Sequence, residues 1–188
     1  MDSTAIAYWI RPEIGITIDY GQRPAAGEIR AAGAICKSLN IEHIVVGCDL
    51  SAMGSGDLAG RPPLSVAPAS EWWPYRNQML ITLAAMVCVG REVGRLLIGA
   101  LKSDGFHADG RRDFIESMNQ LLTLQEGGLR LEAPAIHLDA RELITESNIP
   151  TELLAWSHSC HVSEFACGTC RGCRKHYEVH ETLGNEPY

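Results

Sequence analysis

Four cysteines near the C-terminal end of the sequence have a spacing typical of a metal site. Cys160, Cys167, Cys170 and Cys173 form the run C-x6-C-G-x-C-x2-C. A tetrahedral metal ion needs four soft or imidazole ligands around one point, and turns with two residues between thiolates bring successive sulfurs together there. Charged neighbours such as Arg171 make this stretch polar, which disfavours four buried thiols without a metal. The spacing therefore predicts a structural zinc site with no open coordination position.

Other roles for the cysteines have to be weighed against zinc. A C-x2-C-x2-C run with a fourth, more distant cysteine also suits a [4Fe–4S] cluster, although the cysteine-proline ending of the bacterial ferredoxin run is missing after Cys173. A disulfide framework is disfavoured, because the count of seven cysteines is odd and the chain is not small. Cys36, Cys48 and Cys88 each stand among apolar neighbours, so we interpret them as small buried hydrophobic residues.

Length and charge set limits on the class of protein. With 188 residues the chain can build one full domain and a small C-terminal appendage around the metal. A formal charge of −7 disfavours a protein whose main partner is a nucleic-acid backbone, which would demand a basic surface. No apolar stretch reaches the roughly 18 residues that a membrane span requires. Free thiols favour a reducing, cytoplasmic location.

Strand and helix signals alternate along the sequence. The apolar, β-branched runs that predict strands are 14–19, 43–48, 95–100 and 129–133. The predicted helices are 25–39 with Asn40 as its left-handed stop, 77–89, 112–124, one opened by the capping-box pair Asp139 and Glu142, and one opened by Pro150. The stretches 51–70 and 102–110 lack periodicity and are predicted to be loops.

Apolar strands separated by helices of this length predict an α/β fold with a doubly wound parallel sheet. In such sheets ligands bind beyond the carboxyl ends of the strands. The residues that follow the first three predicted strands are Asp19, Tyr20 and Gln22, then Asp49, then Lys102, Ser103 and Asp104. Each of them alone is typical of a solvated loop. Their shared position at one edge favours a ligand site.

Several segments, in order along the chain, resemble the 7-cyano-7-deazaguanine synthases, ATP-dependent enzymes of queuosine-precursor synthesis among the PP-loop ATP pyrophosphatases. The matching segments are Met1-Asp2-Ser3 for the end of the S-G-G-x-D-S loop, Asp19-Tyr20-Gly21-Gln22, Pro74-Tyr75-Arg76-Asn77, His107 to Phe114, and the cysteine knuckle. The D-Y-G-Q run and the knuckle are the specific ones. The resemblance implies a PP-loop nucleotide-binding domain over residues 1–150 and a zinc-binding segment over 151–188.

The sequence also departs from the family pattern. It begins inside the phosphate-binding loop, so that only Asp2 and Ser3 of that loop remain. The first two knuckle cysteines are closer in sequence than in the family, and His107-Ala108-Asp109-Gly110 replaces a Y-P-D-C segment. These departures suggest a divergent branch, similar to synthase-like proteins of bacterial antiphage operons.

The resemblance implies a reaction in which ATP adenylates the carboxylate of 7-carboxy-7-deazaguanine and ammonia attacks the mixed anhydride. A second adenylation then dehydrates the amide to the nitrile, 7-cyano-7-deazaguanine. The implied nucleotide site uses Asp2, Ser3, Asp19, Tyr20 and Gln22, with Mg²⁺ sharing the charge of the pyrophosphate. The implied catalytic residues are Arg76 and Lys102, on phosphate or carboxylate, and Asp104 and Asp109, on the aminopyrimidine edge or on Mg²⁺.

Two alternative functions stay open on the sequence. A divergent relative could join the activated deazaguanine to a protein amine in place of ammonia, since both reactions share the adenylation half. A zinc-knuckle binding module without activity is suggested by the basic residues Arg171, Arg174 and Lys175. The acidic balance and the single aromatic between the cysteines, Phe165, argue against nucleic acid as its partner. A homodimer is expected from the resemblance alone.

Overall fold

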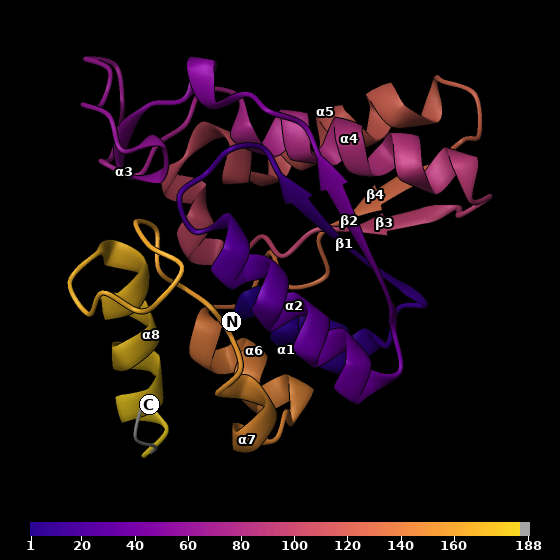
Figure 1. Ribbon diagram of the computed structural model, residues 1–188. Helices are drawn as coiled ribbons and strands as arrows, with labels where there is room; N and C mark the ends of the chain where they lie inside the picture. The colour runs from indigo at the N-terminus through magenta and orange to yellow at the C-terminus, as the bar shows by residue number, and fades with distance from the viewer. Residues whose placement is uncertain (185–188) are drawn as a thin grey trace. The chain divides into compact units, whose positions relative to one another are not determined.

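A computed structural model of the chain describes residues 1–184 (Figure 1). Its contacts group the residues into two compact units. The first contains Met1, Ser3–Pro74 and the described chain from Ile144 on, and the second contains Asp2 and Tyr75–Leu143. The C-terminal segment thus groups with N-terminal residues. The division after residue 150 stays a prediction based on motifs.

The first unit is built on a pair of parallel strands, β1 (Ile14–Asp19) and β2 (Glu42–Gly47), joined by α2 (Ala25–Leu39). α2 packs against both strands. A Cβ on Gly15 would lie 2.8 Å from the sulfur of Cys36, so the close approach of strand and helix requires glycine there. α2 ends at Asn40, whose φ of 55° is left-handed. The predicted strand 14–19 and helix 25–39 are confirmed, and β2 lies one residue earlier than predicted.

Three further helices complete the first unit: α1 (Asp2–Ile10), α7 (Thr151–Leu154) and α8 (Arg171–Thr182). The Ser157 hydroxyl donates to Thr4 Oγ1 at 2.9 Å, and both side chains are buried, so α1 is tied to the segment that precedes the cysteines. α1 and α8 were not predicted. α8 buries one face of mixed chemistry, Cys173, His176, Val179 and His180, which no simple apolar periodicity reveals.

The stretch 51–70 was predicted to be a loop, and the prediction missed two short elements within it. It contains a 3₁₀ turn, η1 (Ser51–Met53), and a short helix, α3 (Gly56–Ala59). The Asp57 N–H donates to the Ser70 carbonyl at 2.8 Å, which closes the stretch on itself. Gly56 has a φ of 68°, and a Cβ there would collide with the same carbonyl, so this closure depends on glycine.

The second unit contains a parallel pair, β3 (Arg95–Leu97) and β4 (Arg130–Glu132). α4 (Arg76–Gly90) contacts β3, and α5 (Arg112–Thr123) contacts β4. The buried side chains of α5 are Ile115, Met118 and Leu122. β3 is shorter than predicted. Pro134, two residues after the end of β4, has no N–H with which to extend the ladder.

The segment between β3 and α5 folds into two 3₁₀ turns, η2 (Lys102–Phe106) and η3 (Ala108–Gly110), where a loop was predicted. The predicted capping box is confirmed at α6 (Ala140–Ser147): Glu142 N–H donates to Asp139 Oδ1 at 2.9 Å, and Asp139 N–H donates to Glu142 Oε2 at 2.8 Å. Parallel strands connected through helices confirm the α/β class. Among the described residues, no helix has both the length and the apolar character needed to cross a membrane.

Candidate functional site

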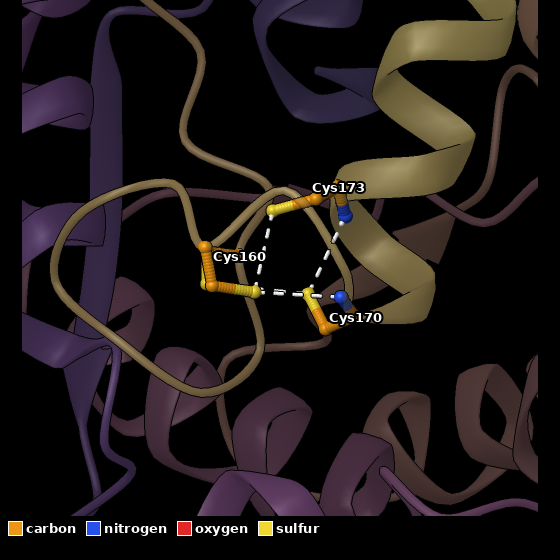
Figure 2. A group of neighbouring side chains, drawn as sticks. Cys160, Cys170 and Cys173 are labelled. Carbon is orange, nitrogen blue, oxygen red and sulfur yellow. Dashed lines mark hydrogen bonds between the residues drawn. The ribbon is translucent and has the colours of Figure 1, made fainter.

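The four cysteines converge, as the sequence predicts. Their sulfur atoms all lie within 4.8 Å of one another. The sulfurs of Cys167 and Cys173 are 3.9 Å apart, and those of Cys160 and Cys170 are 4.0 Å apart. Figure 2 shows Cys160 on the loop that precedes α8, and Cys170 and Cys173 at the start of that helix.

These separations match a single ion. Four sulfurs about 2.3 Å from one tetrahedral zinc stand roughly 3.8 Å from each other. A four-iron cluster is itself several bonds across, so its cysteine sulfurs must stand much further apart. The arrangement of the thiols therefore fits one tetrahedral metal ion better than a cluster.

Backbone geometry holds the sulfurs in place. The N–H groups of Cys170 and Cys173 donate to the sulfurs of Cys167 and Cys170 respectively, each at 3.4 Å. Gly168 has a φ of 76°, and a Cβ on Gly172 would collide with the Ser159 carbonyl. The turn between Cys167 and Cys170 therefore favours glycine at 168 because of its backbone angle, and the turn between Cys170 and Cys173 requires glycine at 172 because a side chain has no space there. N–H groups directed at sulfur favour the thiolate form that a metal needs.

The thiols differ in acidity. Hydrogen bonding from the backbone N–H of Thr169 lowers the pKa of Cys167 to about 6, so this thiol ionises readily. Burial raises the pKa of Cys173 to about 12, and it also raises the pKa of Cys160. Buried thiolates of this kind need a cation beside them. The donor set therefore fits a divalent ion.

The turn after β1 was predicted to bind nucleotide, and two of its side chains are engaged inside the fold. Gln22 is buried; its Oε1 accepts from the Tyr20 N–H at 2.8 Å, and its Nε2 donates to the Ile18 carbonyl at 3.0 Å. The buried Tyr20 ring lies edge-on to Trp73, with centroids 4.9 Å apart. Asp19 remains at the partly exposed edge, where its Oδ1 accepts from the Gly21 N–H at 3.1 Å.

The two remaining candidates for the nucleotide site lie in the first turn of α1. α1 begins at Asp2, and Ser3 is exposed. The N-terminus of a helix carries N–H groups without intrahelical partners and favours anions. Asp49, after β2, is exposed, and hydrogen bonds from the side chain and backbone of Ser51 lower its pKa.

Three of the four predicted catalytic residues lie close together in the second unit. Arg76 is the first residue of α4, and the next N–H, that of Asn77, donates to Asp109 Oδ2 at 3.2 Å. Asp104 Oδ2 accepts from the Leu101 N–H at 2.9 Å, and the Asp104 carbonyl packs against Gly110. Asp104 thus uses one oxygen to brace its own turn, and Asp109 uses one oxygen to hold the start of α4. Lys102 is exposed at the start of η2.

Predicted site residues therefore lie in four places: Asp2 and Ser3 at the start of α1, Asp19 to Gln22 in the turn after β1, Arg76 with Asp104 and Asp109 in the second unit, and the cysteines. Their combination into one site stays a prediction. Sequence reasoning missed Glu71 and Trp73, which lie between the predicted loop 51–70 and Pro74. The W-W pair there was a signal of packing, since loops seldom carry two such large apolar side chains for solvent.

Comparisons with known proteins match nearly the whole chain. The chain is 29% identical to the 7-cyano-7-deazaguanine synthase of Methanosarcina barkeri, over 92% of this chain and 84% of that protein. It is 27% identical to 7-cyano-7-deazaguanine synthase 1 of Desulfitobacterium hafniense, over 99% of this chain and 91% of that protein. It is 30% identical to the 7-cyano-7-deazaguanine synthase of Sulfurimonas denitrificans, over 93% of this chain and 85% of that protein.

A similar fold is found in the U34-tRNA thiolase NcsA from Methanococcus maripaludis, solved with its [4Fe–4S] cluster. The TM-score is 0.54 at 16% identity; the match covers 97% of this chain, which spans 61% of the thiolase chain. This likeness supports the α/β fold. The model of the family described as "Queuosine biosynthesis protein QueC" matches residues 1–184. The chain therefore belongs to the QueC family of queuosine biosynthesis proteins.

Proposed function

We propose that this chain is an ATP-dependent 7-cyano-7-deazaguanine synthase. The observation that carries the proposal is the match to the QueC family along residues 1–184, together with relatives of that name that align over most of their length. In this proposal ATP adenylates the carboxylate of 7-carboxy-7-deazaguanine and releases pyrophosphate. Ammonia then attacks the acyl carbon, AMP leaves, and an amide forms. A second adenylation removes the amide oxygen as AMP and yields the nitrile.

The protein contributes position and charge to these steps rather than a covalent intermediate. Asp2 and Ser3, at the start of α1, face the pyrophosphate, and Mg²⁺ bound with ATP shares its negative charge. Asp19 contacts the nucleotide from the turn after β1. Tyr20 and Gln22 act on that turn from inside the fold, through the hydrogen bonds and ring contact described above.

Arg76 is proposed to hold the carboxylate or phosphate that reacts. A cation at the first residue of a helix is disfavoured by the helix dipole, so a basic residue there calls for an anionic partner. The guanidinium fork can bind two oxygens of one anion. Lys102 supplies a second cation. Asp104 and Asp109 are proposed to contact the aminopyrimidine edge of the base with the oxygens that do not accept from Leu101 and Asn77.

Zinc is the proposed occupant of the cysteine cluster. Cys160, Cys167, Cys170 and Cys173 would hold it with four thiolates, and its contribution is to fix the turn at the start of α8. The close spacing of the sulfurs supports zinc over a [4Fe–4S] cluster such as the one in the thiolase. The free state of all seven cysteines supports a reducing, cytoplasmic location for the enzyme.

A homodimer is also part of the proposal. α4 is apolar on all sides, which is typical of a buried helix. Nevertheless Met86 and Val89 on it are 68% and 44% exposed. A second copy covering these side chains would remove apolar surface from water. Sedimentation of the purified wild-type protein and of a Met86→Glu variant tests this. The wild-type protein should sediment as a dimer and the variant as a monomer.

The proposed activity is tested by incubating the purified protein with ATP, Mg²⁺ and 7-carboxy-7-deazaguanine and measuring pyrophosphate. Release that depends on both the deazaguanine and ammonia supports the synthase. Release that needs a protein amine, with attachment of the base to a polypeptide, indicates the divergent ligase instead. Absence of any release contradicts both enzymes and leaves the binding module.

A further inference from the structure

An ion pair links the start of α8 to the long segment that follows β2. Glu71 Oε1 lies 2.7 Å from Arg171 Nη1. Glu71 is nearly buried, with 7% of its side chain exposed, whereas the Arg171 side chain is 53% exposed. Taking a carboxylate out of water is unfavourable unless a partner compensates it. The guanidinium of Arg171 therefore contributes to holding Glu71 at this position.

Arg171 is itself placed by the cysteines. It is the first residue of α8 and stands between Cys170 and Gly172. Cys170 is the N-cap of the helix, and its sulfur accepts from the Cys173 N–H at 3.4 Å. A metal ion bound to both sulfurs would fix this first turn and, with it, the backbone of Arg171.

Two residues beyond Glu71, Trp73 reaches the turn proposed to bind nucleotide. Trp73 is 3% exposed, and its ring lies edge-on to that of Tyr20, with 4.9 Å between centroids. A Cβ on Gly54 would stand 2.6 Å from the Trp73 ring, so the indole is packed tightly on its other side as well. The Tyr20 carbonyl accepts from the Leu50 N–H at 3.0 Å, where this same segment begins.

We propose that Glu71 is a positioning residue that couples the metal-bound cysteine turn to the nucleotide-binding turn. The contacts run from Cys170 through Arg171 and Glu71 to Trp73 and Tyr20. With the metal bound, the ion pair holds the segment 51–73 to the start of α8, and Trp73 holds the shape of the turn 19–22. The catalytic part of this inference rests on the proposed synthase function; the structural coupling does not.

Hydrogen–deuterium exchange of the zinc-loaded protein tests the coupling segment by segment. In the wild-type protein, removal of zinc by a chelator should raise exchange in 51–73 and in 19–22. In Glu71→Gln, exchange in both segments should be raised already with zinc bound, and chelation should add little. Zinc content of the variant should remain one per chain.

Glu164→Gln is the matched control. Glu164 also forms an ion pair with an arginine, Arg30, at 2.8 Å, and it lies in the loop between the first two cysteines. It has no place in the proposed chain of contacts, so its loss should leave exchange in 19–22 unchanged. If Glu71→Gln is insoluble, Arg171→Gln at the exposed end of the pair should give the same raised exchange.

Kinetics add a second readout. Glu71→Gln should raise the KM for ATP several-fold and leave kcat nearly unchanged, because the residue acts on the turn and not on the reacting atoms. If zinc-loaded Glu71→Gln exchanges hydrogen in the segment 19–22 at the wild-type rate, the proposal is overturned. Loss of zinc from that variant would also overturn it. If the wild-type protein has no synthase activity but the exchange results hold, the proposed function fails and the coupling stands.

Discussion

The rings of His176 and His180 lie nearly face to face on α8, with 4.5 Å between centroids and 24° between planes. Both side chains are fully buried. His176 Nδ1 shares a hydrogen bond of 3.2 Å with the Ser159 hydroxyl. Among the described residues, neither ring nitrogen of His180 has a hydrogen-bond partner. The two buried rings thus anchor α8, and a positive charge on His180 would be unfavourable there because no hydrogen-bond partner in the described part of the chain compensates it.

This pair predicts a loss of stability in acid. Burial lowers the pKa of His180 below its usual value of 6.5, so the unfolded chain binds more protons than the folded one as pH falls through that value. The free energy of unfolding should therefore fall between about pH 7 and pH 5. Urea unfolding at several pH values measures this.

A His180→Phe variant provides the comparison for the acid prediction. It keeps an aromatic ring against His176 but cannot be protonated, so its stability should depend less on pH in this range. Zinc content is measured at each pH, because protonation of Cys167, with a pKa of about 6, also weakens metal binding. Equal pH dependence of variant and wild type at full zinc occupancy would contradict the prediction.

Loss of one cysteine ligand should remove the metal. In Cys173→Ser, zinc should fall from one per chain to near zero, since four thiolates converge on one point and Cys173 is buried there. We expect the melting temperature to drop by roughly 10 °C, because about 1 kcal/mol shifts it by a few degrees in a chain of this size and a structural zinc contributes more than that.

Cys88→Ser is the control for the cysteine experiment. Cys88 is buried in α4, outside the cluster, so the variant should keep its zinc while losing some stability. Full zinc content in Cys173→Ser would show that the cluster is not the metal site. A brown protein with iron and sulfide would show that the ion is not zinc.

The knuckle should also depend on one glycine. A methyl group at Gly172 would collide with the Ser159 carbonyl and press against the His161 ring, so Gly172→Ala should shift the first turn of α8 and weaken zinc binding. Overpacking of this kind costs about 1–3 kcal/mol. Gly105→Ala is matched to it, because no atom lies within 4 Å of the added carbon. Competition with a coloured chelator measures both affinities.

Arg76 and Arg112 offer a matched pair for the catalytic proposal. Each is the first residue of a helix in the second unit, but only Arg76 adjoins Asn77, which binds Asp109. We expect Arg76→Ala to lower kcat/KM by about 100-fold, as for the loss of one charged contact in the transition state, and Arg112→Ala to change it little. Steady-state pyrophosphate release measures both. An unchanged rate in Arg76→Ala would remove this residue from the site.

Much of the fold could be predicted because the relevant signals are local. The run Ile14 to Asp19 is apolar and β-branched, the capping box at Asp139 needs only residues three apart, and the cysteine spacing specifies its own turns. α8 was missed because its buried face mixes cysteine and histidine with a single aliphatic residue. The pair of Glu71 and Arg171 joins residues 100 apart in sequence, so only the folded chain reveals it.

The turn at Asp19 to Gln22 shows the same limit within a motif. The letters D-Y-G-Q mark the turn, but they do not tell which side chains face a ligand. Hydrogen bonds to Tyr20 N–H and to the Ile18 carbonyl place the Gln22 amide inside the fold, and packing of Trp73 from a distant segment covers Tyr20. Long-range packing decides such orientations, and no local pattern encodes it.

Isotope labelling tests the central claim most directly. Purified protein is incubated with ATP, Mg²⁺, 7-carboxy-7-deazaguanine and ¹⁵N-ammonia, and the small-molecule products are analysed by mass spectrometry. We predict 7-cyano-7-deazaguanine with one ¹⁵N in its nitrile, together with AMP and pyrophosphate. Unconverted acid, or label-free transfer of the base to a polypeptide, would contradict the assignment of this chain as a 7-cyano-7-deazaguanine synthase.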